Sequence, residues 1–155
     1  MRHLAILFAL GVALAAPNDT SGLSFAQPGA AALVQLELRP VDGVIFNRLG
    51  PSAVRLENPF KPSETLSVGL NGTPWAGDPE HYFGTVKPLE FRLTVPSNTK
   101  PGTYPLKLEA ELYLCNSAIR VCFRSLFKAQ AELRVGVSGE SRAAVIEVSP
   151  PKPRG

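Results

Sequence analysis

Apolar and polar residues alternate along several short stretches of this chain. The alternation is clearest in residues 34–38, 66–70, 89–95, 104–115 and 127–135. A period of two residues is typical of β-strands that bury one face and expose the other. Segments rich in proline, glycine and asparagine separate these stretches, and none of them shows the 3.6-residue period of a helix. We therefore predict an all-β protein, an antiparallel β-sandwich of about seven to nine strands.

One connection between the predicted strands is unusually long. Residues 71–88 show no clean strand pattern, yet they include Trp75, Tyr82 and Phe83. Loops of this length inside compact domains tend to be lids or binding loops. We expect either such a role, or that these aromatic side chains cover an open end of the sandwich.

The two ends of the chain differ from its middle. Arg2, an apolar run over residues 4–14 and small residues before Pro17 form a signal peptide pattern, for which we expect cleavage after residue 15. We predict a periplasmic or secreted protein with no membrane insertion after cleavage, and one domain over residues 16–136. Residues 137–155 are expected to add an edge strand and a proline-rich, partly disordered tail.

Charge and histidine content exclude several functions. Without Arg2 the net charge falls to +2, and no basic cluster stands out, so nucleic acid is not an expected partner. His81 is the only histidine outside the signal peptide, and no Ser-His-Asp hydrolase arrangement is apparent. We expect a monomer that needs no cofactor.

The two cysteines, Cys115 and Cys122, are the main candidates for chemistry. An exported protein meets an oxidising compartment, where such a pair is expected to form a disulfide. The even positions of residues 106–114 are apolar, so alternation places Cys115 on the opposite, polar face. The pattern of residues 127–135, extended backward, places Cys122 on the outer face too, if no bulge intervenes. The two thiols would then face each other near the tip of a hairpin, outside the core.

Such a disulfide is either a structural staple or a working redox pair. It would close a loop of about eight residues and stabilise the fold by about 2.5 kcal/mol, half the value for a long loop. Strained and accessible disulfides are the ones that exchange readily. A metal site of Cys115, Cys122 and His81 lacks the four ligands of structural zinc, so we predict no metal. A non-catalytic interaction domain with a structural disulfide remains the main alternative.

Two segments resemble a known family, the N-terminal periplasmic domain of the thiol:disulfide interchange protein DsbD and its stand-alone secreted relatives. The stronger match is "VPSNTKPGTYPLKLEAELYLCNSAIRVCF", residues 95–123, and the weaker is "DGVIFNRLGPSAVRLENP", residues 42–59. The resemblance implies an immunoglobulin-like sandwich. It also implies a hairpin cysteine pair that relays reducing equivalents to oxidised extracytoplasmic proteins from a thioredoxin-like donor, which a membrane electron transporter supplies.

The same resemblance assigns roles to individual residues. Cys122 would be the attacking, more exposed cysteine and Cys115 its resolving partner. A cap loop would shield the pair and open when a partner docks; its residues would be Asp78, Glu80, His81, Tyr82, Phe83 and Gly84. The residues expected near the pair are Tyr113, Asn116 and Phe123. Arg120 and Arg124 flank Cys122 and are placed to favour its thiolate, although solvated hairpin charge is the simpler interpretation.

Overall fold

A computed structural model describes residues 20–151, which form eleven β-strands and no helix. The prediction of an all-β protein is confirmed. The signal peptide predicted over residues 1–15 and the last residues of the predicted tail, 152–155, lie outside the described residues. In the described part, no helix is long and apolar enough to cross a membrane.

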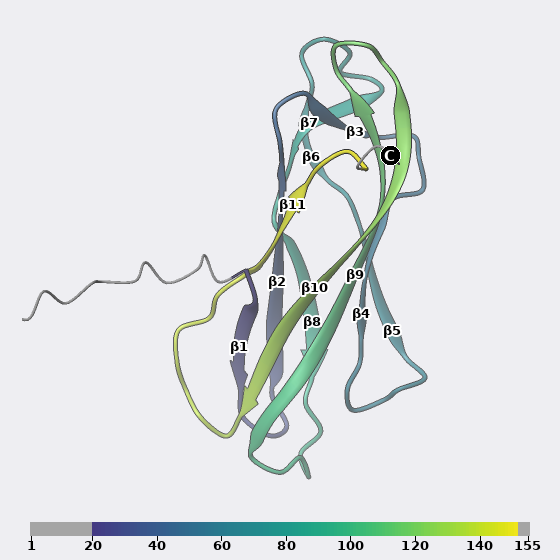
Figure 1. The fold of residues 1–155 in the computed structure, drawn as a ribbon. Helices are drawn as coiled ribbons and strands as arrows, with labels where there is room; N and C mark the ends of the chain where they lie inside the picture. Colours follow the sequence, from purple (N-terminus) through teal and green to yellow (C-terminus); the bar gives the residue numbers. More distant parts are fainter. Residues whose placement is uncertain (1–19, 152–155) are drawn as a thin grey trace, which may run out of the picture.

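The strands form two sheets of unequal size (Figure 1). Eight strands form a strongly curled sheet: β1 (Gly22–Ala26), β3 (Val44–Asn47), β4 (Ala53–Glu57), β5 (Thr65–Gly69), β6 (Gly72–Pro74), β7 (Tyr82–Val86), β9 (Gly102–Asn116) and β10 (Cys122–Val135). The other three form a small second sheet: β2 (Ala31–Pro40), β8 (Leu89–Thr94) and β11 (Ala144–Val148). The long strands β9 and β10 run along most of the molecule, and β9 also pairs with β3 and β4.

Both sheets are mixed, which corrects the prediction of a purely antiparallel arrangement. β1 pairs with β10 in parallel, and β11 pairs with β2 in parallel. Alternation along a strand fixes which side chains point inward, but it carries no information about the direction of the neighbouring strand. The expected strand near the end of the chain is confirmed as β11, at the edge of the small sheet.

The core lies between the facing apolar sides of the two sheets. The inward positions of β9 are Leu106, Leu108, Ala110, Leu112 and Leu114, each at most 2% exposed, as the alternation predicts. Each buried leucine contributes about 1.5–3 kcal/mol relative to an exposed one. β2, β8 and β11 supply the opposite side of the same core cluster. Because β11 follows β10 in the sequence, residues after Val135 also contribute to this core.

The expectation that residues 71–88 lack strands is wrong. β6 and β7 pair with each other in this segment, and β7 also pairs with β3. Only residues 75–81 form the turn between them, which we call the β6–β7 turn. The short strands and their glycines, Gly72 and Gly84, hide the alternation. In Figure 1 this turn lies beside the tip of the β9–β10 hairpin, at the upper end of the molecule.

Candidate functional site

The β9–β10 hairpin carries both cysteines at its tip. The register is continuous from the pair Val135 and Gly102 to the pair Cys122 and Cys115. The parity extended backward from residues 127–135 therefore holds, and the predicted position of the two cysteines, opposite each other on the outer face, is confirmed. Their sulfur atoms form a disulfide with a Cα separation of 4.0 Å.

A short turn closes the hairpin beyond the cysteines. The side-chain oxygen of Asn116 accepts hydrogen bonds from the backbone N–H groups of Ala118 and Ile119, at 2.9 and 3.2 Å. Asn116 also donates its backbone N–H to the carbonyl of Val121 at 2.9 Å. That bond makes the neighbouring cysteines a non-hydrogen-bonded pair, the kind in which cross-strand Cα atoms approach most closely. Asn116, expected near the pair, thus shapes the turn that joins its two strands.

The two cysteines differ sharply in exposure. Cys122 is exposed, whereas Cys115 is fully buried, although it points away from the core. Cys115 pairs with Ile45 of β3, which is also buried, and neither residue belongs to the core cluster. Both side chains must therefore be covered from the outer face of the sheet. Cys115 lies outside the core cluster, as predicted, and Cys122 is the more exposed of the two cysteines, as expected. The neighbouring strand β3 lies beside Cys115.

The β6–β7 turn supplies aromatic side chains on this face. Trp75 donates its backbone N–H to the carbonyl of Tyr82 at 2.9 Å, and the two rings meet edge to face, with their centres 6.0 Å apart. Trp75 lies beside Gly84, on the side of β7 to which a Cβ atom at residue 84 would point. Gly84 follows the residue of β7 that pairs with β3, so the Trp75 ring lies on the same outer face as Ile45.

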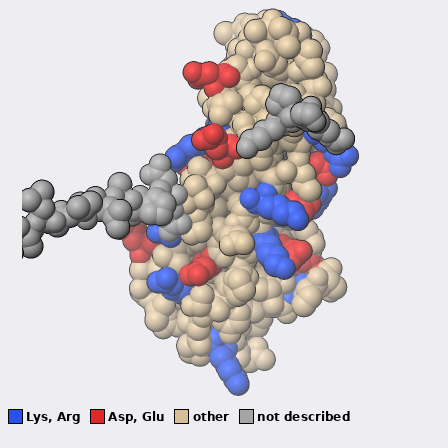
Figure 2. All heavy atoms as spheres, viewed as in Figure 1, with Lys and Arg blue, Asp and Glu red and all other residues tan. Residues whose placement is uncertain are grey.

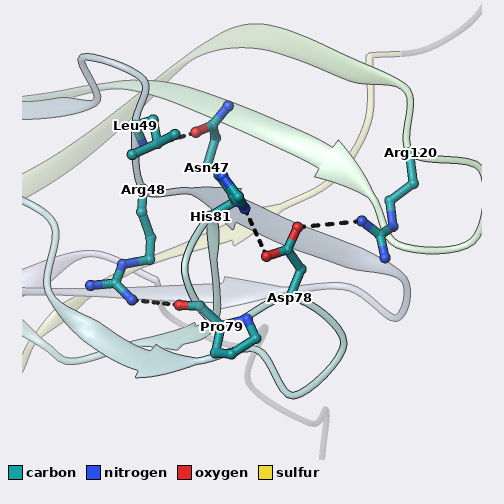
Figure 3. A network of polar contacts seen from close by, with 7 residues as sticks. All are labelled: Asn47, Arg48, Leu49, Asp78, Pro79, His81 and Arg120. Atoms are coloured by element: carbon teal, nitrogen blue, oxygen red, sulfur yellow. Dashed lines mark hydrogen bonds and ion pairs between the residues drawn. The ribbon is translucent and has the colours of Figure 1, made fainter.

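Arg120 joins the hairpin tip to the β6–β7 turn. The centre of its guanidinium lies 4.9 Å from the ring centre of Trp75 and 5.9 Å from that of Tyr82. The same group forms an ion pair with Asp78 at 3.6 Å (Figure 3). Asp78 also contacts Nδ1 of His81 at 2.8 Å through its other carboxylate oxygen. The turn is therefore attached to the hairpin by charge and by aromatic stacking.

A second arginine holds the far side of the turn. Arg48, which follows β3, donates from its guanidinium to the carbonyl of Pro79 and from its backbone to the carbonyl of His81, the latter at 2.8 Å. Its guanidinium also lies 4.7 Å from the ring centre of Phe83. The β6–β7 turn is thus held by Arg48 from the end of β3 and by Arg120 from the tip of the β9–β10 hairpin.

The predicted cap loop is only partly a cap. Asp78, Glu80 and His81 lie in the turn and Tyr82 begins β7, with Glu80 and His81 exposed. Phe83, however, is 8% exposed and belongs to the core, so the expectation that it covers the cysteines is corrected. It pairs with Phe46, whose side chain is also in the core, and alternation then points it inward.

Two further residues expected near the pair flank it from neighbouring positions. Tyr113 lies on the outer face of β9, where Gly50 packs against its side chain. Phe123 is partly buried and packs against the core, because it lies one position beyond Cys122. Neither aromatic ring is among the groups that join the turn to the hairpin.

Arg124 on the outer face of β10 has a different partner from Arg120. Its guanidinium forms an ion pair with Glu111 at 3.0 Å, and Arg55 of β4 contacts the same carboxylate at 3.5 Å. The hydrogen bond from Arg124 lowers the pKa of Glu111 below its ordinary value. Both arginines that flank Cys122 in sequence are therefore paired with carboxylates, and their side chains remain 48% and 61% exposed, which agrees with solvated hairpin charge.

Exposed apolar side chains lie beside Cys122 at the hairpin tip, between its two ion-paired arginines. Ile119 and Val121, in the turn before it, are 67% and 56% exposed. On the face seen in Figure 2, charged side chains gather over the middle and lower parts, and the hairpin tip itself carries the ion pair of Arg120 with Asp78.

Metal binding and known relatives give no further assignment. Residues 20–151 contain no group of three or more His, Cys, Asp or Glu side chains placed to hold a metal ion. No protein-family model matches the sequence, and no curated protein matches it significantly. The chemistry of the site must therefore be argued from its own geometry.

Proposed function

We propose that this protein is an exported thiol–disulfide exchange protein whose Cys115–Cys122 pair relays reducing equivalents. The observation that carries this proposal is the difference between the two sulfur atoms, one exposed at a hairpin tip and one buried beneath a cover. A disulfide that exchanges needs one sulfur within reach of a partner, and burial of the other sulfur directs the attack to the exposed one.

The exchange is a sequence of two displacements. A thiolate of the reduced donor attacks Sγ of Cys122, the bond between the two cysteines breaks, and Cys115 takes up the electron pair and a proton. The second thiol of the donor then attacks the donor sulfur of the mixed disulfide, so that the donor leaves oxidised and Cys122 becomes a thiol. In the reverse direction, Cys122 attacks an oxidised acceptor, and Cys115 displaces the reduced acceptor as the disulfide reforms.

The proposal extends to the fold type and the partners. We infer an immunoglobulin-like sandwich related to the N-terminal domain of DsbD; the curled sheet and the small sheet that share one core support this. The donor would be a thioredoxin-like protein fed by a membrane electron transporter, and the acceptors would be oxidised proteins of the periplasm or of another extracytoplasmic compartment. The exposed apolar residues at the hairpin tip suit transient docking of such proteins.

The main alternative is a structural disulfide in a non-catalytic interaction domain. Closing about eight residues of an already paired hairpin stabilises the fold by only about 2.5 kcal/mol. The strand pairing already holds the two cysteines opposite each other. A staple at this position therefore adds little that the hairpin lacks.

Trapping the mixed disulfide tests the proposal. Cys115→Ser leaves the exposed Cys122 thiol, and Cys122→Ser leaves the covered Cys115 thiol. The partner is a thioredoxin-like protein that keeps only its attacking cysteine, supplied as its mixed disulfide with thionitrobenzoate. We expect the thiolate of Cys115→Ser to displace the thionitrobenzoate anion and form the covalent complex at least about tenfold faster than Cys122→Ser. Equal trapping by the two variants, or trapping by neither, would contradict the proposed roles.

A further inference from the structure

The backbone of Arg120 adopts a conformation that is unfavourable for its residue type. Its φ angle is 55°, and within residues 20–151 every other residue with positive φ is glycine. This left-handed region crowds the side chain of any residue with a Cβ atom, and glycine or asparagine is the usual choice. An arginine at this position needs a compensating contact.

The side chain of Arg120 makes that contact with the β6–β7 turn. Its guanidinium lies between two aromatic rings and a carboxylate, those of Trp75, Tyr82 and Asp78. A planar guanidinium can stack on aromatic faces and pair with a carboxylate at the same time, which an ammonium group cannot do equally well. Asp78 is held in place by its second contact, to His81 (Figure 3).

The contact between Arg120 and the β6–β7 turn lies on the same face of the sheet as Cys115. β3 lies between β7 and β9, so the Trp75 ring over β7 and the Arg120 side chain from the hairpin tip approach the outer face from two sides. Ile45 of β3 and Cys115 of β9 lie on this outer face, and both are buried without belonging to the core cluster. Cys122, one strand farther out, is exposed.

We infer that Arg120 is a positioning residue that holds the β6–β7 turn over Cys115 and so directs attack to Cys122. We call the contacts of Arg120 with Trp75, Tyr82 and Asp78 the latch. Its role in directing exchange rests on the proposed function, whereas its role in covering Cys115 is independent of that function. The side chain of Arg120 remains 48% exposed, so a docking protein can reach it and displace it from the rings. Release of the latch would uncover Cys115 at the moment when it must act.

Alkylation of single-cysteine proteins tests the latch without any redox partner. In the Cys122→Ser background, Arg120→Asn removes the guanidinium and suits the left-handed backbone, so the fold is not put at risk. We expect the alkylation rate of Cys115 by iodoacetamide to rise about fivefold, the combined effect of one exposed cation–π contact and one surface ion pair. That ratio corresponds to about 1 kcal/mol.

A pH profile separates positioning from simple charge. Removal of a cation near a thiol shifts the midpoint of the profile, whereas loss of the cover raises the plateau at high pH, where the thiol is fully ionised. Arg120→Lys keeps the charge without the planar stack and should raise the plateau as well. Arg124→Asn is the matched control, because residue 124, like residue 120, is two positions from residue 122 in the sequence, but its side chain pairs with Glu111. This variant should leave the plateau unchanged.

The same variants have a spectroscopic readout, because Trp75 is the only tryptophan in the chain. Arg120→Asn should make its fluorescence more accessible to acrylamide, and Arg124→Asn should not. An unchanged Cys115 plateau in Arg120→Asn, or an equal rise in Arg124→Asn, would overturn the latch. Either result would leave the exchange proposal standing, because mixed-disulfide trapping tests that proposal separately.

Discussion

Cys122 lies directly opposite Cys115 in the register of β9 and β10, yet Cys115 is fully buried and Cys122 is exposed. Cross-strand partners on one face usually share a similar environment, since they point in the same direction. Here the environment changes across one strand, because β3 pairs with β9 beside Cys115, whereas β1 pairs with β10 only at residues 131–135, far from Cys122. A partner's thiolate can therefore reach Cys122 but not Cys115.

The apolar hairpin tip should control how fast partners dock. Val121→Asp places a charge on a surface that we expect a thioredoxin-like protein to cover, so the exchange rate should fall about tenfold. Val137→Asp is the control: this residue is similarly exposed, at 51%, but lies beyond the opposite end of β10. An equal loss in both variants, measured by stopped-flow exchange, would argue against a docking role for the tip.

Gly77 should be needed for the position of Trp75. A Cβ atom at residue 77 would lie 2.4 Å from the Trp75 ring, too close for any ordinary contact, so Gly77→Ala must displace the ring. We expect acrylamide quenching of the tryptophan to increase about twofold, with faster alkylation of Cys115 in the Cys122→Ser background. Gly69→Ala is the control, because a Cβ there meets no described atom within 4 Å. Unchanged quenching in Gly77→Ala would show that the ring does not depend on this contact.

The ion pair of Arg124 with Glu111 should contribute to stability in a pH-dependent way. The folded chain lowers the pKa of Glu111, so the stabilisation is complete above the unfolded pKa and is lost as the pH falls through the folded one. Arg124→Gln should raise that pKa toward its ordinary value, as followed by NMR titration of the carboxyl group. Its stability deficit should also shrink in acid.

A second variant shows whether the pKa of Glu111 responds to Arg124 in particular or to the loss of any positive charge on β10. Arg134→Gln on the same strand removes an equal charge from a residue that pairs with Glu132 instead. A similar rise of the Glu111 pKa in both variants would contradict a specific role for Arg124.

The hairpin that carries the cysteines could be predicted because the alternation that defines it lies within its own two strands. A strict period of two over residues 106–114 and 127–135 fixes the faces of both strands, and a regular hairpin carries that pattern to the tip. The burial of Cys115 could not be predicted in this way, since it comes from strands far away in the sequence. One signal was present: residues 44–46, "VIF", are three consecutive apolar residues, the pattern of a strand covered on both faces.

The hydrophobic pattern of the sequence predicted neither the parallel strand pairs nor the contacts of Arg120 with the β6–β7 turn. β1 and β11 are short, and nothing in a five-residue alternation indicates the direction of its neighbour. Arg120 resembles any exposed hairpin charge in the sequence. Its contacts with Trp75 and Asp78 depend on a turn more than thirty residues away in the chain.

The equilibrium reduction potential of the Cys115–Cys122 pair tests the central claim most directly. It can be measured by equilibrating the protein with defined ratios of reduced and oxidised thiols and separating the two forms. An exchange relay predicts a value between about −180 and −270 mV, the range of known thiol–disulfide oxidoreductases. A value below about −300 mV would identify a structural staple and contradict the proposed function.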